Sequence, residues 1–292
     1  MNNSDPLVSV NIPTLNSENT ISECIESVLK QTYKNIEVLV IDGGSRDNTV
    51  SIAKNLGATV LLDEGSLLSA RKTGILSSSG QFILLLDSDQ VLRPNSIEIL
   101  VKSTEENDML CLGESAVSQR KLPQKLLNAS KQLSQSNLSE YLNPYSGLLL
   151  PRFFRASLIK NAINTIKPRA FEIVFDRDHQ IIFYESWKLS NKVGFVGDLL
   201  YHDEPSSLVT VIKKAYRWGI SAGFLRSSDL YSELLKNKSI IRRPGNSTNG
   251  SESKFTLFLS TTLITLVKAF PYGFGYLLGN LSGFKERRRL SD

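Results

Sequence analysis

An uninterrupted apolar run that ends in two acids, Phe82 to Asp89, limits most strongly what this chain can fold into. Such a run is typical of a strand buried on both faces of a parallel sheet, because a half-exposed strand would alternate polar and apolar residues. Ligands of open α/β sheets bind beyond the carboxyl ends of such strands. The run therefore predicts a buried strand whose end, with Asp87 and Asp89, faces a ligand site.

The two carboxylates at this strand end allow two interpretations. Asp87 and Asp89 repel each other unless a positive charge lies close, and hard cations such as Mg²⁺ bind carboxylates together with substrate phosphates. This favours a site for a metal-bound phosphorylated substrate. The same residues also fit an acidic turn that follows a strand.

Strands and helices are expected to alternate strictly along the first part of the chain. β-branched runs predict strands and three- and four-residue apolar spacing predicts helices. Strict alternation is typical of a right-handed parallel α/β sheet, which would bring Pro13, Thr14, Asp42 and Asp87 to one edge. The expected strands are 7–12, 36–41, 58–62 and 82–86, and the expected helices are 20–31, 49–56 and 67–77. Further along the chain, residues 145–152 also have strand character.

Composition narrows the class of protein only modestly. The chain has 292 residues, 41% of them hydrophobic, and a net charge of +5, which permits nucleic acid, a membrane surface or a phosphorylated substrate as partner. Its two cysteines, Cys24 and Cys111, lack metal-ligand spacing, so we expect plain packing in a reducing compartment. The first residues have no basic and apolar pattern of a signal peptide.

Four short segments recur in a fixed order along the first part of the chain: Val8–Asn16, Val40–Thr49, Ala70–Ile75 and Leu86–Asp89. Together they resemble the family 2 glycosyltransferases of GT-A fold. Any one of them is a weak signal, but their order and spacing match over roughly the first hundred residues. The resemblance implies a Rossmann-like, mostly parallel sheet flanked by helices, and a metal-dependent, inverting transferase of hexosyltransferase type that uses Mg²⁺ or Mn²⁺.

The resemblance also implies roles for individual residues of the strand ends. Asp42 would contact the base, Arg71 the diphosphate, and Asp87 and Asp89 the ribose and the metal; a cation can neutralise a phosphate in this way. The residues expected around the nucleotide-sugar are Pro13, Thr14, Asn16, Asp42, Ser45, Arg71, Asp87 and Ser88.

Two residues depart from the family pattern. Leu15 stands where an aromatic residue is common, and Lys72 stands where asparagine is frequent. Helix capping by Asn16 and a solvated helix face around Arg71 are the structural alternatives for this region.

A second acidic centre precedes a predicted helix at 180–184. In inverting family members a Glu-Asp pair starts this helix and a histidine follows a later strand; Asp178 and His202 fit, with Arg177 in place of the glutamate. Asp178 is our candidate general base, with Asp176 in reserve, because inversion requires a group that takes the acceptor proton. His202 is a candidate metal ligand beside Asp87 and Asp89, or a loop histidine bonded to a neighbouring acid.

The last third of the chain is amphipathic and basic. Residues 207–225 predict a helix with Lys213, Lys214 and Arg217 on one side, and 242–251 a linker. The apolar stretch 255–279, broken by Lys268, suits a helix hairpin or an interfacial segment; a spanning helix or a helical pair packed on the catalytic domain are alternatives.

We expect the chain to consist of four parts and to be a membrane-associated transferase. Residues 1–205 would form the catalytic domain, 206–241 a basic helical region, 242–254 a linker and 255–292 an apolar segment with a basic end. The enzyme would move sugar from a nucleotide-sugar donor to a glycan or lipid-linked acceptor at the cytoplasmic face of an anionic membrane. We expect no nucleic acid as a partner. The alternatives are a nucleotidyltransferase and a binding-only relative recruited to membranes; the first lacks its usual Gly-rich basic loop at Pro13–Asn16.

Overall fold

The computed structural model of this chain describes residues 5–116, 120–135, 138–174, 176–202, 204–228, 230–235 and 254–291. It divides into two compact units. Unit 1 comprises Met1–Ser115 and Leu150–His202, and unit 2 comprises Ala116–Leu149 and Asp203–Asp292. The four-part division expected from the sequence stays a prediction.

Unit 1 is built on one eight-stranded mixed sheet with strand order β3-β2-β1-β4-β7-β6-β8-β5. Its first four strands pair in parallel, whereas β7 pairs antiparallel with both β4 and β6, and β5 pairs antiparallel with β8. The strands are β1 (Val8–Thr14), β2 (Ile36–Asp42), β3 (Thr59–Leu62), β4 (Phe82–Leu85), β5 (Gln90–Leu92), β6 (Met109–Ala116), β7 (Pro151–Arg155) and β8 (Val193–His202).

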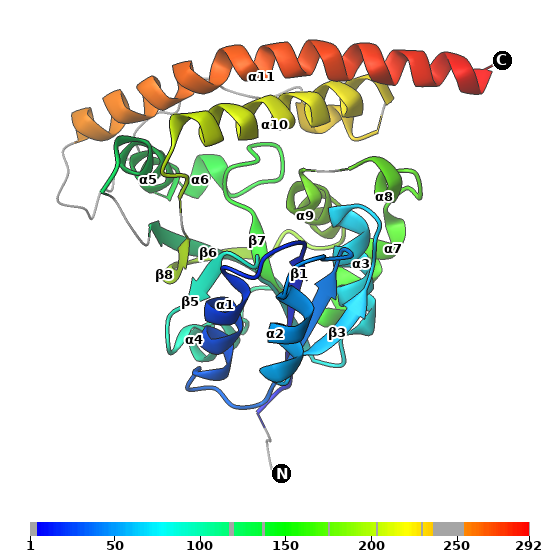
Figure 1. The fold of residues 1–292 in the computed structure, drawn as a ribbon. Helices are drawn as coiled ribbons and strands as arrows, with labels where there is room; N and C mark the ends of the chain where they lie inside the picture. The colour runs from blue at the N-terminus through cyan, green and yellow to red at the C-terminus, as the bar shows by residue number, and fades with distance from the viewer. Residues whose placement is uncertain are drawn as a thin grey trace. The chain divides into compact units, whose positions relative to one another are not determined.

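Helices cover both faces of this sheet (Figure 1). They are α1 (Ile21–Leu29), α2 (Thr49–Asn55), α3 (Leu67–Ser77), α4 (Ser96–Lys102), α7 (Ala156–Thr165), α8 (Ala170–Ile173) and α9 (Asp178–Leu189). As predicted for a strand covered on both faces, β4 is a continuous apolar run and all its residues are buried. All of β1 is buried too, although Ser9 and Asn11 alternate with its apolar residues.

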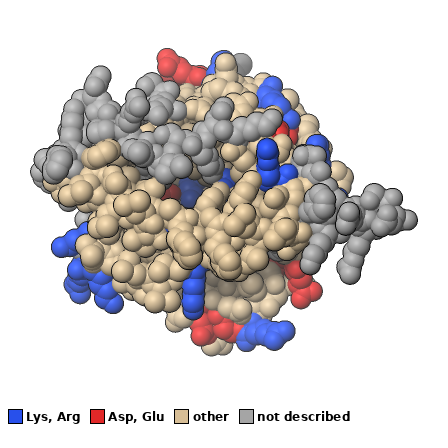
Figure 2. Space-filling model, turned by 90° about the horizontal axis from the view of Figure 1, so that it is seen from above, with Lys and Arg blue, Asp and Glu red and all other residues tan. Residues whose placement is uncertain are grey.

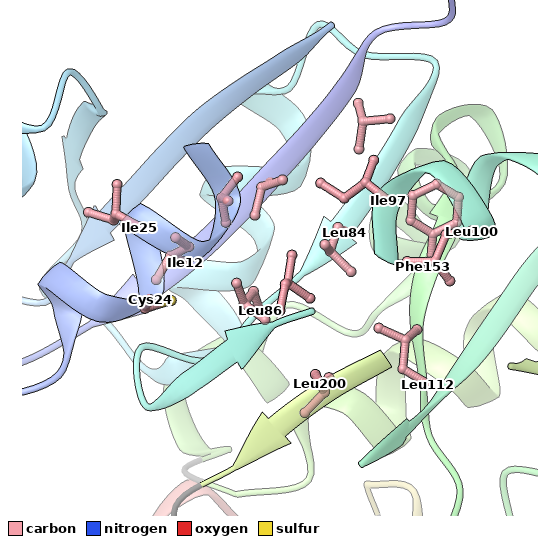
Figure 3. Close-up of a cluster of buried hydrophobic side chains, with 14 of the residues drawn as sticks. Ile12, Cys24, Ile25, Leu84, Leu86, Ile97, Leu100, Leu112, Phe153 and Leu200 are labelled. Carbon is pink, nitrogen blue, oxygen red and sulfur yellow. The ribbon is translucent and has the colours of Figure 1, made fainter. Parts of the chain in front are cut away.

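The larger core cluster lies on the face covered by α1, α2 and α4 (Figure 3). Ile12 from β1, Leu84 from β4 and Phe153 from β7 meet Ile25 of α1 and Ile97 of α4 there. Cys24 and Cys111 are free and buried, which agrees with their expected packing role. This core fixes the strand ends on which the site is built.

One segment that the sequence assigned to a strand is a turn. Residues 145–150 were expected to continue into β7, but the strand begins at Pro151. The side-chain oxygen of Asn143 accepts hydrogen bonds from the backbone N–H groups of Tyr145 and Ser146, and Gly147 has a φ of 61°. An Asn-initiated turn therefore replaces the start of the predicted strand.

Unit 2 is helical and consists of α5 (Leu122–Gln135), α6 (Leu138–Tyr141), α10 (Leu208–Ser228), the 3₁₀ turn Ser232–Leu235 and α11 (Lys254–Ser291). Helices α10 and α11 lie side by side and run in the same direction (Figure 1). Their glycines permit this: a Cβ at Gly219 would lie 2.1 Å from the carbonyl oxygen of Tyr272, and one at Gly275 would lie 2.2 Å from that of Tyr216.

Of the alternatives expected for 255–279, the helix hairpin is wrong, because α11 continues as one helix through Pro271. A proline inside a helix removes one backbone hydrogen bond, and we attribute the continuity to the close packing of α10 against the residues that follow this position. The segment Thr256–Ser282 is long and apolar enough to cross a membrane, and only 17% of its most apolar window is buried.

Candidate active site

The ends of three parallel strands meet at one edge of the sheet, as the sequence predicts. Thr14, the last residue of β1, pairs in register with Asp42, the last residue of β2. On the other side of β1, the N–H of Leu86 donates to the carbonyl oxygen of Asn11 at 3.0 Å, and the chain continues into Asp87. The predicted nucleotide-sugar residues Pro13, Thr14, Asp42 and Asp87 therefore share this edge.

Hydrogen bonds join the loops that follow β1, β2 and β4. The backbone N–H of Asn16 donates to Ser45 Oγ at 2.8 Å, and the N–H of Arg46 donates to Asn16 Oδ1 at 2.9 Å. Asn16 has a φ of 51°, in the left-handed region that asparagine tolerates. Ser17 Oγ lies 3.1 Å from Ser88 Oγ. Three predicted site residues, Asn16, Ser45 and Ser88, thus belong to one connected rim.

Asp42 carries an acceptor that the protein leaves unpaired. Its Oδ2 atom accepts from the N–H groups of Gly44 and Ser45 at 3.0 and 2.9 Å. Its Oδ1 atom, and Thr14 Oγ1 beside it in register, are buried without a hydrogen-bond partner among the described residues. Such unpaired polar atoms are rare in folded proteins and are explained by a ligand or ordered water.

Arg71 of α3 links two predicted acids from distant parts of the chain. Its side chain is fully buried; Nε donates to Asp178 Oδ2 at 3.0 Å and Nη2 donates to Asp87 Oδ1. The same Nη2 lies 2.8 Å from His179 Nε2. The structure thereby brings the predicted base to the end of β4.

Arg152 of β7 is a second cation of this site, which sequence reasoning missed. Its side chain is 13% exposed, with Nη1 2.9 Å from Asp87 Oδ2 and Nε 3.3 Å from Glu114 Oε1. Nη1 also lies 3.2 Å from His179 Nε2. In the sequence, the signal that could have indicated Arg152 is a positively charged residue inside an apolar strand. We call Arg71, Asp87, Glu114, Arg152 and Asp178 the charge cluster.

The arginines of the charge cluster shift the pKa values of its member Asp87 and of the neighbouring His179. Burial raises the pKa of the Asp87 carboxyl, but the guanidinium groups of Arg152 and Arg71 outweigh burial and hold that pKa well below its usual value. For His179, burial and then the charge of Arg71 lower the pKa. His179 is therefore neutral at neutral pH, and its Nε2 faces two guanidinium groups as an acceptor.

His202, the last residue of β8, lies beside Asp89. Gln90 of β5 pairs in register with His202, so that Asp89, one residue earlier, is close: its Oδ2 atom lies 3.4 Å from His202 Nε2. His202 Nδ1 lies 3.5 Å from Glu114 Oε2. Two of the three predicted metal ligands are thus neighbours, whereas Asp87 is engaged by both arginines.

Asp178 is the first residue of α9 and is buried. It follows Arg177, which has a φ of 88° and whose Nη1 donates to Gln180 Oε1 at 2.8 Å. The reserve candidate Asp176 lies two residues before Asp178 and is half-buried. Leu15, at the position where family members carry an aromatic residue, is 57% exposed.

Comparison with known proteins agrees with this geometry. A family model described as glycosyl transferase family 2 matches residues 9–174. The glycosyltransferase GlyG of Streptococcus pneumoniae is 26% identical over 67% of this chain and 69% of its own length. An Escherichia coli UDP-Glc:alpha-D-GlcNAc-diphosphoundecaprenol beta-1,3-glucosyltransferase, WfgD, is 40% identical over 36% of this chain and 44% of its own length.

Among solved structures, glucosyl-3-phosphoglycerate synthase from Mycobacterium tuberculosis, in complex with Mn²⁺, UDP-glucose and phosphoglyceric acid, has a TM-score of 0.54. It is 19% identical, and the match covers 81% of this chain and 82% of that one. This likeness confirms the predicted GT-A fold. The next curated relatives after GlyG match over less than half of their own length.

Proposed function

Because the chain belongs to glycosyl transferase family 2, we propose that it is a metal-dependent hexosyltransferase that transfers a sugar, with inversion, from a nucleotide-diphosphate sugar to an acceptor hydroxyl or phosphate. The observation that carries the proposal is the charge cluster at the strand ends, with Asp89 and His202 beside it. UDP-glucose in a structural neighbour and in the name of WfgD makes a UDP-sugar the first donor to test.

The nucleotide would bind across the ends of β1 and β2. The unpaired Oδ1 of Asp42 is suited to accept a hydrogen bond from an N–H of the base. Asn16, Ser45 and Ser88 line the rim next to it. The exposed side chain of Leu15 offers an apolar contact to the base. Arg71 acts through Asp87 and Asp178, because its guanidinium group is fully buried against them.

Asp89 and His202 fit a divalent cation. No group of three or more His, Cys, Asp or Glu side chains that could hold a metal occurs among the described residues. Mg²⁺ and Mn²⁺ sites commonly use one or two protein ligands plus substrate phosphates. Asp89 Oδ2 and His202 Nε2, 3.4 Å apart, supply such a pair. A bound cation would neutralise the charge of the departing diphosphate.

Asp178 would take the proton of the acceptor as the acceptor oxygen attacks the sugar. Its position at the first turn of α9 and its bond to Arg71 fix the direction of its carboxylate. Arg71 also ties this base to Asp87. The base and the diphosphate site are therefore held in one network.

Unit 2 would hold the enzyme at a membrane that carries a lipid-linked or surface-glycan acceptor, as the name of WfgD suggests. Exposed apolar side chains recur every three or four residues along α11, so that they form one stripe roughly 33 Å long. We call this set the apolar stripe: Leu259, Leu263, Leu266, Phe270, Phe274, Leu277 and Leu281. In Figure 2, which views the molecule from above, much of the described surface is uncharged, with Lys and Arg scattered over it.

A position in the plane of the interface fits unit 2 better than a span across it. Helix α10, which packs along α11, carries the exposed cations Lys213 and Arg217. Charged side chains in the middle of a bilayer are costly, whereas cations at its surface are attracted to anionic lipid. We therefore place the apolar stripe in the headgroup region of the anionic cytoplasmic leaflet.

Vesicle flotation tests the membrane part of the proposal. We expect the protein to float with vesicles that contain phosphatidylglycerol, and Leu266→Glu with Phe270→Glu to abolish flotation. Leu29→Glu, at a leucine of α1 that is 51% exposed, is the matched control and should float like the parent. A parent that stays in the soluble fraction, or a control that loses flotation equally, would contradict the assignment.

Calorimetry tests the donor part. We expect UDP to bind the parent with Mn²⁺ present, and Asp89→Asn and Asp42→Asn each to weaken binding at least tenfold. Glu98→Gln, at an exposed i,i+4 ion pair in α4, is the control. Absence of UDP and UDP-sugar binding to the parent would remove the proposal.

A further inference from the structure

Glu114, near the end of β6, is a charged residue of the site that the sequence analysis did not single out. Its side chain is 16% exposed, so most of it is removed from water. A carboxylate in that position needs partners, and Arg152 and His202 are two of them. Oε1 lies 3.3 Å from Nε of Arg152, and Oε2 lies 3.5 Å from Nδ1 of His202.

The other nitrogen of His202 is the one beside Asp89. Nε2 lies 3.4 Å from Asp89 Oδ2, so that the two ring nitrogens face two different carboxylates. The backbone pairing of Gln90 with His202 places Asp89, in the turn before β5, beside the end of β8, and β6, which carries Glu114, is the other neighbour of β8 in the sheet. The two carboxylates therefore flank the ring, one on the side of each nitrogen.

The carboxylate beside Nδ1 of His202 can determine which ring nitrogen carries the proton. A histidine that ligates a metal through one nitrogen donates the N–H of the other, commonly to a carboxylate, which selects the tautomer and the ring orientation. Arg152 can only donate, so it holds Oε1 of Glu114 and leaves Oε2 to accept. The same guanidinium binds Asp87, which keeps that acid away from the role of ligand.

We propose that Glu114 is a positioning residue that fixes His202 with its proton on Nδ1 and leaves Nε2 bare toward Asp89, as a ligand for the divalent cation. This rests on the proposed function, since the cation accompanies a nucleoside diphosphate. Glu114 itself touches neither the cation nor the sugar donor.

The substitution Glu114→Gln tests this role more sharply than a truncation. The single amide oxygen of glutamine must accept from Arg152, because two donors would otherwise face each other, and the NH₂ group then faces Nδ1 of His202. Nδ1 must become an acceptor, and the proton moves to Nε2, where it blocks the cation. Glu114→Gln should therefore weaken Mn²⁺ binding at least as much as Glu114→Ala, although glutamine preserves the shape of the side chain.

Electron paramagnetic resonance of Mn²⁺ in the presence of UDP measures this effect. We expect Glu114→Gln to weaken Mn²⁺ binding about 10- to 100-fold, the usual effect of removing such an outer carboxylate. In a His202→Gln background the same change should have almost no further effect. Glu98→Gln, remote from the site in α4, should bind like the parent.

Nitrogen-15 NMR reads the tautomer directly, because the chain has two histidines. Loss of one signal set in His202→Gln assigns His202. In the complex with Mg²⁺ and UDP we expect protonated Nδ1 and unprotonated Nε2, and a proton on Nε2 in Glu114→Gln.

Two results would overturn the role of Glu114 and leave the proposed function in place. One is Mn²⁺ binding to Glu114→Gln as tight as to the parent. The other is binding that is clearly weaker in Glu114→Ala than in Glu114→Gln, as a packing role predicts. A parent that binds UDP but no Mn²⁺ would overturn the cation site and this role together; a parent that binds neither would overturn the proposed function as well.

Discussion

The charge cluster of unit 1 buries charged side chains, whereas the apolar stripe of unit 2 exposes apolar ones; both are the reverse of what is usual in a folded protein. In the charge cluster, Arg71 and Arg152 are almost removed from water and paired with carboxylates. In the apolar stripe, Leu266 is 66% and Phe270 is 83% exposed. Buried charge and contiguous exposed apolar surface are the informative exceptions in a fold. The first therefore indicates chemistry, and the second indicates a surface that something covers.

The substitution with the largest expected effect removes the proposed general base and leaves the donor site intact. Asp178→Asn keeps a hydrogen-bond acceptor for Arg71 Nε but cannot take a proton. We expect transfer or donor hydrolysis to fall about 100- to 10,000-fold while UDP binding changes little. The measurement is donor consumption beside calorimetry. Asp198→Asn, at a largely exposed acid of β8, serves as control; unchanged turnover in Asp178→Asn would leave the base unassigned.

Removing one cation of the charge cluster tests whether its charges depend on each other. Arg71→Met leaves Asp87 and Asp178 without their shared partner, and breaking a buried ion pair costs about 3–5 kcal/mol. Urea unfolding should show this loss. Arg46→Met, at an exposed arginine, should stay within about 0.5 kcal/mol of the parent. Equal stability of the two variants would mean that the cluster is solvated.

A smaller effect on stability tests the packing of α10 against α11 in unit 2, which carries the apolar stripe. Gly275→Ala would place a Cβ 2.2 Å from the carbonyl oxygen of Tyr216, which forces α10 and α11 apart and costs about 1–3 kcal/mol. Gly273→Ala meets nothing within 4 Å and should stabilise the helix by about 1 kcal/mol. Thermal unfolding followed by helicity distinguishes them. A similar gain in both variants would refute close packing of the two helices.

The smallest effect concerns pH. The folded pKa of His179 lies below its ordinary value of 6.5. The unfolded chain therefore binds a proton first, and stability falls as pH drops below about 6.5. Asp87 has a depressed pKa in the folded state, so its protonation also lowers stability as pH falls, but only below about pH 4. We expect His179→Gln to flatten the unfolding free energy between pH 7.5 and 5. An unchanged slope would contradict a neutral His179.

The sequence predicts the parallel half of unit 1 well. β4 is a continuous apolar run, and β1 and β2 are rich in Val and Ile. Since parallel strands leave a sheet at one edge, the neighbourhood of Thr14, Asp42 and Asp87 follows from local pattern. The antiparallel half does not follow in the same way. Arg152 and Glu114 meet because β6 and β7 pair although 34 residues, 117–150, separate them in the sequence, and no local pattern indicates that pairing.

The same limit applies in unit 2. Pro271 and its neighbouring glycines are typical of a break, so a hairpin was one of the alternatives expected for 255–279. The glycines Gly275 and Gly279 serve contact with α10 instead, and this tertiary packing keeps the helix continuous. Small residues at four-residue spacing signalled close packing rather than a turn.

The most direct test of the account is a crystal structure of the protein with UDP and Mn²⁺. We predict a cation bonded to Asp89 Oδ2 and His202 Nε2 and to the diphosphate, with the base hydrogen-bonded to Asp42. Nucleotide bound away from these carboxylates, or a cation held by other residues, would contradict the central claim that the strand ends of unit 1 form one donor site.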